Sequence, residues 1–268
     1  MTHPFFNPPR PVILGHRGAA GSAPENTLIA FEEGLRQGAH MLESDIQVSA
    51  DGVPILLHDS RVDRTTQGTG EASDLSLDQI KGLDASARFR PAPGIKAARG
   101  SENPLRIPTL REAFEEFPEA AFNLEIKGKS AQLVSAVVAL VREFDREDRT
   151  LLTAGEDDTQ ALLREELRKT RAQPALGASL SDILDVVRSA QSKTAPQTDS
   201  MALQIPSLFG GAPLATAELI AHCHRYTIEV HVWTINDPEE MTHLLDLGVD
   251  GLVTDNPEIM ARVLADRA

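Results

Sequence analysis

Hydrophobic and polar residues alternate most clearly over residues 41–59. This stretch predicts a strand, a tight turn at Asp51-Gly52 and a second extended arm, because Asp-Gly between β-favouring residues is a strong hairpin signal. Side chains alternate along a strand, so Glu43 and Asp45 share one face and the apolar residues share the other. The pattern therefore predicts two carboxylates side by side on one strand.

Short apolar runs alternate with amphipathic segments along the rest of the chain. Further strands are predicted at residues 12–14, 121–127, 150–154, 175–179, 201–205, 228–233 and 251–254. Helices are predicted at about residues 24–38, from 108 onward, at 130–144, 158–169, 181–189, 216–224 and 238–247, and from 257 to the C-terminus. About eight strands alternating with helices predict an α/β fold, a closed TIM-type (β/α)8 barrel, with an open doubly wound sheet as the alternative.

Residues 60–106 interrupt this alternation, because their periodicity is poor and glycine and proline are frequent. Long segments of this kind often form lids or binding loops in compact domains. We interpret residues 1–268 as a single barrel domain with an insertion at about residues 60–106, after the second strand.

Composition narrows the classes of partner. The chain has 26 basic and 40 acidic residues, a net charge of −14, which argues against a nucleic-acid partner. The single Cys223 excludes an internal disulfide framework and a cysteine zinc cluster. No apolar run approaches the roughly 20 residues of a membrane span, and the N-terminus lacks a signal pattern. We expect a cytoplasmic protein, and the sequence leaves its oligomeric state open.

Polar residues gather at the predicted strand ends. Strand C-termini of such a barrel open at one mouth, where the chemistry is placed. The residues at or near these ends are His16, Glu43, Asp45, Glu125, Lys127, Trp233 and Asp255. His58 ends the second arm of the hairpin and can fold back toward the same mouth. Neighbouring carboxylates repel unless a cation lies between them, and oxygen ligands suit a hard divalent ion such as Mg²⁺ or Ca²⁺.

A series of short motifs, spread over nearly the whole chain, resembles the glycerophosphodiester phosphodiesterase family in order and spacing. The motifs are His16-Arg17-Gly18, Pro24-Glu25-Asn26-Thr27, Glu43-x-Asp45, Asp51-Gly52-x-Pro54, His58-Asp59, Arg64-Thr65-Thr66-x-Gly68-x-Gly70, Ile107-Pro108-Thr109-Leu110, Glu125-x-Lys127, Trp233-Thr234-x-Asn236 and Gly251-x-x-Thr254-Asp255.

The resemblance implies a barrel enzyme that hydrolyses glycerophosphodiesters to glycerol 3-phosphate and an alcohol with the help of a divalent metal ion, Mg²⁺ or Ca²⁺. Matched motif by motif, it implies metal ligands at Glu43, Asp45 and Glu125, a general acid–base pair at His16 and His58, phosphate contacts from Arg17 and Lys127, and a pocket wall at Trp233. The nucleophile is either a hydroxyl of the substrate glycerol or a metal-bound water, and the sequence does not choose between them.

The chemistry of this reaction needs these residue types. A phosphodiester gains negative charge on its oxygens during attack, so fixed cations stabilise the transition state more than the ground state. The attacking oxygen loses a proton and the leaving alkoxide gains one, and histidines exchange protons near neutral pH.

Three alternatives remain to be weighed. A lysophospholipase D-type enzyme would share the barrel but needs an apolar entrance. Leu75, Leu77, Ile80 and Leu83 of the insertion could provide this entrance or could pack the insertion onto the barrel. A non-catalytic phosphate-binding barrel would lack a histidine or a carboxylate, and none is missing. A metal amidohydrolase is disfavoured, because the first strand is not followed by a His-x-His pair.

Overall fold

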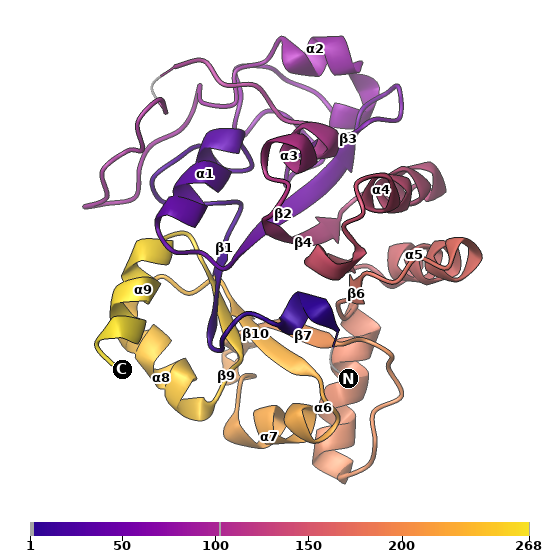
Figure 1. Cartoon of the computed structure of the whole chain (residues 1–268), viewed down its shortest axis with the longest axis vertical. Helices are drawn as coiled ribbons and strands as arrows, with labels where there is room; N and C mark the ends of the chain where they lie inside the picture. Colours follow the sequence, from indigo (N-terminus) through magenta and orange to yellow (C-terminus); the bar gives the residue numbers. More distant parts are fainter. Residues whose placement is uncertain (1–2, 102, 268) are drawn as a thin grey trace.

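Eight parallel strands close into a ring in the order β6-β5-β4-β2-β1-β11-β10-β7 (Figure 1). The computed structural model describes residues 3–101 and 103–267. The strands of the ring are β1 (Val12–Gly15), β2 (Met41–Val48), β4 (Ala121–Ile126), β5 (Thr150–Thr153), β6 (Ala175–Leu176), β7 (Ala202–Pro206), β10 (Glu229–Trp233) and β11 (Gly251–Thr254). A bridge between Gly177 and Ala202 joins β6 to β7 and closes the ring. The predicted barrel is confirmed, and the open doubly wound sheet is excluded.

Helices surround the ring, as Figure 1 shows. They are α1 (Leu28–Arg36), α3 (Leu110–Glu116), α4 (Ala131–Glu143), α5 (Asp157–Thr170), α6 (Leu180–Ser192), α7 (Ala217–Arg225), α8 (Pro238–Leu247) and α9 (Pro257–Ala265). Thr109 and Glu112 form a capping box at α3, and the Asp237 side chain caps α8. Asn256 stands at the N-cap position of α9, but its side chain makes no capping hydrogen bond. Instead, Asn256 donates to Asn236.

The N-terminal segment packs against the end of the barrel where the strands begin. Phe5 and Phe6, in the short 3-10 helix η1 (Pro4–Phe6), are buried in one cluster with Leu14, Met41 and Val253. This apolar layer keeps water from the strand N-termini. The strand C-termini lie at the opposite end of the ring.

The predicted hairpin is present. β3 (Pro54–Leu56) pairs antiparallel with β2, and Gly52 in the turn has φ 81°, a conformation that favours glycine. The following segment contains the 3-10 helix η2 (Ala72–Asp74) and the short helix α2 (Leu77–Lys81). Leu75, Leu77, Ile80 and Leu83 pack in a cluster that also contains residues of the hairpin and residue 107. These four side chains hold the segment onto the barrel and do not form an apolar entrance.

Two predicted boundaries differ from the structure, and one element was not anticipated. The predicted strand at 175–179 is only two residues long, because Ser179 already caps α6. The first helix begins at Leu28, since residues 16–27 form a loop. A small hairpin of β8 (Leu208–Phe209) and β9 (Ala212–Pro213) follows β7. Among the described residues, no helix is long and apolar enough to cross a membrane.

Candidate functional site

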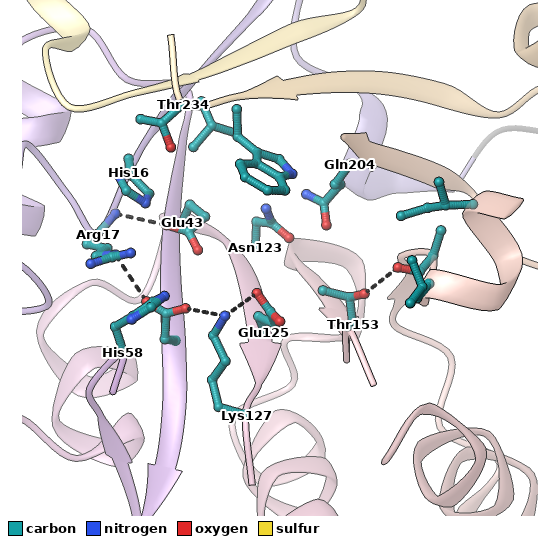
Figure 2. A pocket seen from close by; sticks show the side chains of 17 residues that line it. His16, Arg17, Glu43, His58, Asn123, Glu125, Lys127, Thr153, Gln204 and Thr234 are labelled. Atoms are coloured by element: carbon teal, nitrogen blue, oxygen red, sulfur yellow. Dashed lines mark hydrogen bonds and ion pairs between the residues drawn. The ribbon is translucent and has the colours of Figure 1, made fainter. Parts of the chain in front are cut away.

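A cavity of about 430 Å³ opens at the C-terminal end of the ring (Figure 2). All eight residues that the sequence predicts for a site line it: His16, Arg17, Glu43, Asp45, His58, Glu125, Lys127 and Trp233. They come from the ends of four strands of the ring and from the residues after β3. Residues separated by more than 200 positions in the chain thus face one space. The structure brings the predicted set together, and their individual roles remain predictions.

The register of β2 and β4 determines which polar side chains are neighbours. Asp45 pairs with Glu125, and Glu43 pairs with Asn123. Burial and the nearby Asp45 carboxylate raise the pKa of Glu43 to about 7. Glu43 accepts a hydrogen bond from the backbone N–H of Arg17 at 2.9 Å. Burial is the larger of these two causes, so the raised pKa marks Glu43 as a carboxyl group held away from water.

Two basic side chains reach the buried Asp45 from opposite directions. Its Oδ2 atom lies 3.3 Å from Arg17 Nε, and its Oδ1 atom lies 3.4 Å from Lys127 Nζ. Lys127 also donates to Glu125 at 2.7 Å. Burial alone would lower the pKa of Lys127, but Glu125 and Asp45 outweigh it and raise the pKa. Lys127 therefore stays charged at the floor of the cavity.

The loop after β1 presents Arg17 to the cavity. Gly18 has φ 91°, and a Cβ atom there would come within 2.4 Å of the backbone of Ala30, so the His-Arg-Gly sequence needs a glycine at this place. Arg17 itself adopts a left-handed conformation with φ 50°. Its guanidinium bonds to Glu25 at 2.7 Å, and the side chain is mostly buried. The close packing of the loop against α1 fixes where this cation lies.

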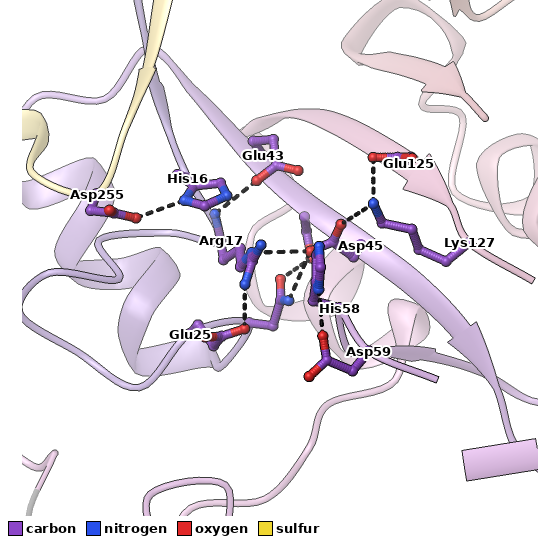
Figure 3. A network of polar contacts seen from close by, with 12 residues as sticks. His16, Arg17, Glu25, Glu43, Asp45, His58, Asp59, Glu125, Lys127 and Asp255 are labelled. Carbon is purple, nitrogen blue, oxygen red and sulfur yellow. Dashed lines mark hydrogen bonds and ion pairs between the residues drawn. The ribbon is translucent and has the colours of Figure 1, made fainter. Parts of the chain in front are cut away.

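Each histidine is held by a carboxylate through the same ring atom (Figure 3). His16 Nδ1 lies 2.6 Å from Asp255, and His58 Nδ1 lies 2.6 Å from Asp59. Because a carboxylate accepts the hydrogen bond, each Nδ1 carries the proton and each Nε2 is left for other chemistry. Burial would lower the pKa of His16, but the hydrogen bond from its ring to Asp255 and the Glu43 charge outweigh it and raise the pKa.

Sequence reasoning assigned no site role to four residues that the structure places around this cavity. Asp255 and Asp59 orient the histidines, and Asn26 donates to Asp45 at 3.2 Å. The Asn123 amide oxygen lines the cavity, is buried and has no hydrogen-bond partner. All except Asn123 lie inside recognised motifs, so their position was available from the sequence. The pairing of Asp59 with its neighbour His58 was available as well, but the contacts of Asp255 and Asn26 were not, because they join residues that only the barrel brings together.

The acidic side chains are not assembled as a metal site in this conformation. Among the described residues, no group of three or more Asp, Glu, His or Cys side chains is arranged to hold a metal ion. Lys127 occupies the space between Asp45 and Glu125 and supplies positive charge there. The carboxylates that could bind a metal ion lie on the adjacent strands β2 and β4. In this conformation Asp45 contacts Arg17 and Lys127, and Glu125 contacts Lys127.

The cavity has a charged half and an uncharged half. The labelled charged residues in Figure 2 gather around β1, β2 and β4, while Thr153 and Gln204 lie on the other side. Ala178, Leu180, Ile183 and Trp233 also line the cavity and carry no charge. A ligand with one anionic end and one uncharged end would fit this division.

Comparisons with known proteins agree with this geometry. The model of the glycerophosphoryl diester phosphodiesterase family matches residues 16–259. A glycerophosphodiester phosphodiesterase of Caldanaerobacter subterraneus is 29% identical, and the match covers 94% of this chain and 97% of that protein. One of Bacillus subtilis is 29% identical, with coverage of 97% and 88%. An Oleispira antarctica phosphodiesterase, solved with its product sn-glycerol-3-phosphate, is similar at a TM-score of 0.77 and 25% identity, over 96% of this chain and 97% of that one.

Proposed function

The chain belongs to the glycerophosphoryl diester phosphodiesterase family, and from this premise we propose that it hydrolyses glycerophosphodiesters to glycerol 3-phosphate and an alcohol at the cavity described above. One observation carries the proposal: two histidine–carboxylate pairs, two fixed cations and three acidic side chains line a single cavity. A barrel that only bound phosphate would not need two oriented imidazoles.

His16 and His58 form the acid–base pair in this proposal. The raised pKa of His16 favours its protonated form, which suits donation of a proton from Nε2 to the leaving alkoxide. His58, oriented by Asp59, accepts the proton of the attacking oxygen. The attacking oxygen needs this base whether it belongs to the substrate glycerol or to water.

Arg17 and Lys127 are proposed to bind the phosphate. Nearby acids raise the pKa of both side chains despite their burial, so both keep their charge. The phosphoryl oxygens gain negative charge during attack, and fixed cations in a partly dry site stabilise that charge without reorganising. Arg17 is held by Glu25, which keeps its guanidinium facing the cavity.

Glu43, Asp45 and Glu125 would hold a divalent metal ion, Mg²⁺ or Ca²⁺. The donor set is suitable, because carboxylate oxygens are the ligands that hard cations prefer. The amide oxygen of Asn123, which pairs with Glu43 across β2 and β4, is buried and has no hydrogen-bond partner, so the fold leaves one further oxygen donor beside these acids. When bound, such an ion withdraws electron density from the oxygens that it contacts.

The test is release of glycerol 3-phosphate from glycerophosphocholine and glycerophosphoethanolamine by the purified chain. We expect turnover that EDTA abolishes and that Mg²⁺ or Ca²⁺ restores. His16→Ala and His58→Ala should each lower kcat by at least about 100-fold, the contribution typical of a general acid or base. His243→Ala, which alters an exposed histidine of α8, is the matched control. Full activity in either site variant would refute the assigned chemistry.

The proposal extends to the domain organisation of the chain, its cellular location and the size of its substrate. We propose one domain in which residues 60–106 form an insertion beside the cavity, since the leucines there pack onto the hairpin. We propose a cytoplasmic location, in keeping with the single cysteine Cys223, which is free and buried. We propose a small-molecule substrate because the cavity at the site measures about 430 Å³.

A further inference from the structure

Arg88 and Arg90 are basic residues that the fold leaves without a carboxylate partner. They lie in residues 85–106, which contain five basic residues and one acidic residue, although the whole chain has a net charge of −14. Arg88 Nε donates to the Thr66 carbonyl at 2.7 Å, and Arg90 donates to the carbonyl of the residue before it at 2.5 Å. Neither takes part in an ion pair among the described residues. Most N–H groups of both guanidiniums are therefore available to a ligand.

Both arginines line a pocket of about 190 Å³ between the segment after β3 and the loop after β1. Arg64 and Glu25 line it as well. The charge of Glu25 is already compensated, because both of its oxygens accept from Arg64 and one of them also accepts from Arg17. Three arginines and one glutamate thus leave this pocket with an excess of two positive charges.

The pocket is separate from the reaction cavity but only one ion pair away from it. Among the described residues, none lines both spaces. Arg17 lines the cavity, Glu25 lines the pocket, and their side chains are bonded at 2.7 Å (Figure 3). A ligand in the pocket would therefore not compete with the substrate for space, yet it would lie beside the carboxylate that holds Arg17.

The segment that carries these arginines is attached to the loop after β1, which also carries His16. The backbone of Ala92 donates to the Gly21 carbonyl at 2.8 Å, and that of Ala98 donates to the Ser22 carbonyl at 2.7 Å. A ligand bound by the two arginines just before these bonds would fasten the segment to the loop more firmly. Its binding would be felt first in the backbone of residues 85–98.

We propose that this pocket binds a phosphate group, as inorganic phosphate or as a small phosphate monoester, at a site outside the reaction cavity. A phosphate dianion matches the excess of two positive charges, and its oxygens suit the paired N–H groups of guanidinium. A tetrahedral anion is small enough for a pocket of about 190 Å³. Arg64 connects the anion to the reaction centre, because it also bonds to Asp59 and Glu25.

An anionic membrane surface fits these arginines less well. Arg88 and Arg90 line a concave space between two segments of one chain, which admits a small ion and not a lipid surface. The net charge of −14 also opposes the approach of the whole molecule to anionic lipid.

The experiment measures binding of inorganic phosphate and, separately, of glycerol 3-phosphate to the full chain in EDTA at constant ionic strength. We expect a dissociation constant on the order of 1 mM, because both arginines are exposed. Hydrogen–deuterium exchange then locates the site. At ten times the dissociation constant, amides in residues 85–98 should exchange about tenfold more slowly, since the closed segment is the form that binds. The ligand that gives this protection identifies the source of the phosphate group.

The Arg88→Gln/Arg90→Gln double variant should lose the protection of residues 85–98 and bind at this site at least about tenfold more weakly. Its melting temperature and its turnover of glycerophosphocholine without added phosphate should match those of the parent. Lys96→Gln/Arg99→Gln is the matched control, because it removes the same charge from the same segment and neither residue lines the pocket. It should keep the protection.

Three results would overturn the inference. The first is no protection of residues 85–98 by either ligand, and the second is an equal loss in both double variants, which would indicate general attraction of anions. The third is binding of the segment to anionic vesicles without binding of free phosphate or its monoester. Because these measurements follow binding, absence of activity on every diester would count against the proposed function and not against this site.

Discussion

Arg64 connects the segment after β3 to both sides of the reaction centre, and its removal is a sharp test of how the site is held. Its Nε atom donates to Asp59 at 2.5 Å, and its two terminal nitrogens donate to Glu25 at 2.6 and 2.7 Å. Asp59 holds His58, and Glu25 holds Arg17. We predict that Arg64 acts as a positioning residue for the base and for the phosphate-binding guanidinium at once.

The size of the effect follows from these three bonds. A buried hydrogen bond to a charged group contributes about 1.5–3 kcal/mol, but an exposed ion pair contributes only about 0.2–1 kcal/mol. The Arg64 side chain is 46% exposed, so we take about 1 kcal/mol for each bond. Loss of the bond to Asp59 should then lower kcat/KM about fivefold in Arg64→Ala. Loss of both bonds to Glu25, about 2 kcal/mol, should lower Tm by about 4–8 °C.

The pH–rate profile separates positioning from simple stabilisation. Burial would raise the pKa of Asp59, but the hydrogen bonds from Arg64 and His58 outweigh it and lower the pKa. Without Arg64 the pKa of Asp59 rises, and the protonated acid no longer accepts from the His58 ring. The acidic limb of the kcat/KM profile should therefore move to higher pH in Arg64→Ala. Arg64→Lys should recover part of the rate, because one ammonium cannot serve both carboxylates as the guanidinium fork does.

Arg61→Ala provides the matched control. Arg61 is 51% exposed and pairs with Asp63 and Glu71, all within the same segment and outside the cavity. It should lower Tm to a similar or smaller degree and leave the rate and its pH profile unchanged. If Arg64→Ala behaves in the same way as Arg61→Ala in all three measurements, the argument for positioning is refuted and Arg64 only fastens the segment.

Three further predictions test other parts of the structure. Asn123→Leu should lower kcat/KM at least tenfold without lowering Tm, because it removes a buried amide oxygen that has no partner in the fold; unchanged kinetics would show that this oxygen does not serve the reaction. Arg146→Ala should lower stability by about 4 kcal/mol in a urea titration, because its buried guanidinium donates to three backbone carbonyls; a loss below about 1 kcal/mol would contradict the count. Burial lowers the pKa of His231 to about 4. Between pH 6.5 and 4 the His231 side chain is therefore protonated in the unfolded chain but neutral in the folded chain. Stability should fall as the pH drops from 6.5 toward 4, by on the order of 3 kcal/mol, and His231→Phe should show less of this fall.

Much of the barrel could be predicted from the sequence because each strand is a short apolar run bounded by a turn. The predicted length was wrong for the shortest strand, β6 at Ala175–Leu176, since two residues carry no periodicity that could set its end. The signal failed for the β8–β9 hairpin, whose residues are exposed and so lack the alternation that a buried face imposes. Packing of one face against the hydrophobic core produces the alternation of apolar and polar residues. Elements without a buried face, such as β8 and β9, lack this alternation in the sequence.

The candidate site was predictable for a different reason. Strand ends meet at one mouth in any parallel barrel, so polar residues at those ends converge whatever their distance in the chain. The register decides finer matters, such as Glu43 lying beside Asn123 and Asp45 beside Glu125. The register between β2 and β4 cannot be predicted from the sequence of either strand alone. For this reason Asn123, whose amide oxygen has no hydrogen-bond partner, was not predicted as part of the site.

The two halves of the mouth come from different parts of the chain, and this division has a consequence. The two histidines, the two basic and the three acidic side chains that line the cavity all precede residue 128. The exposed large apolar side chains, in contrast, all follow from Leu180 onward among the described residues. Asp255 is the exception, because β11 lies next to β1 in the ring and can reach His16. Loops on one side can therefore change without moving the residues that act on phosphorus. Substitutions at the exposed residues Leu208 and Phe209, which do not line the cavity, should therefore leave the chemical step as it is.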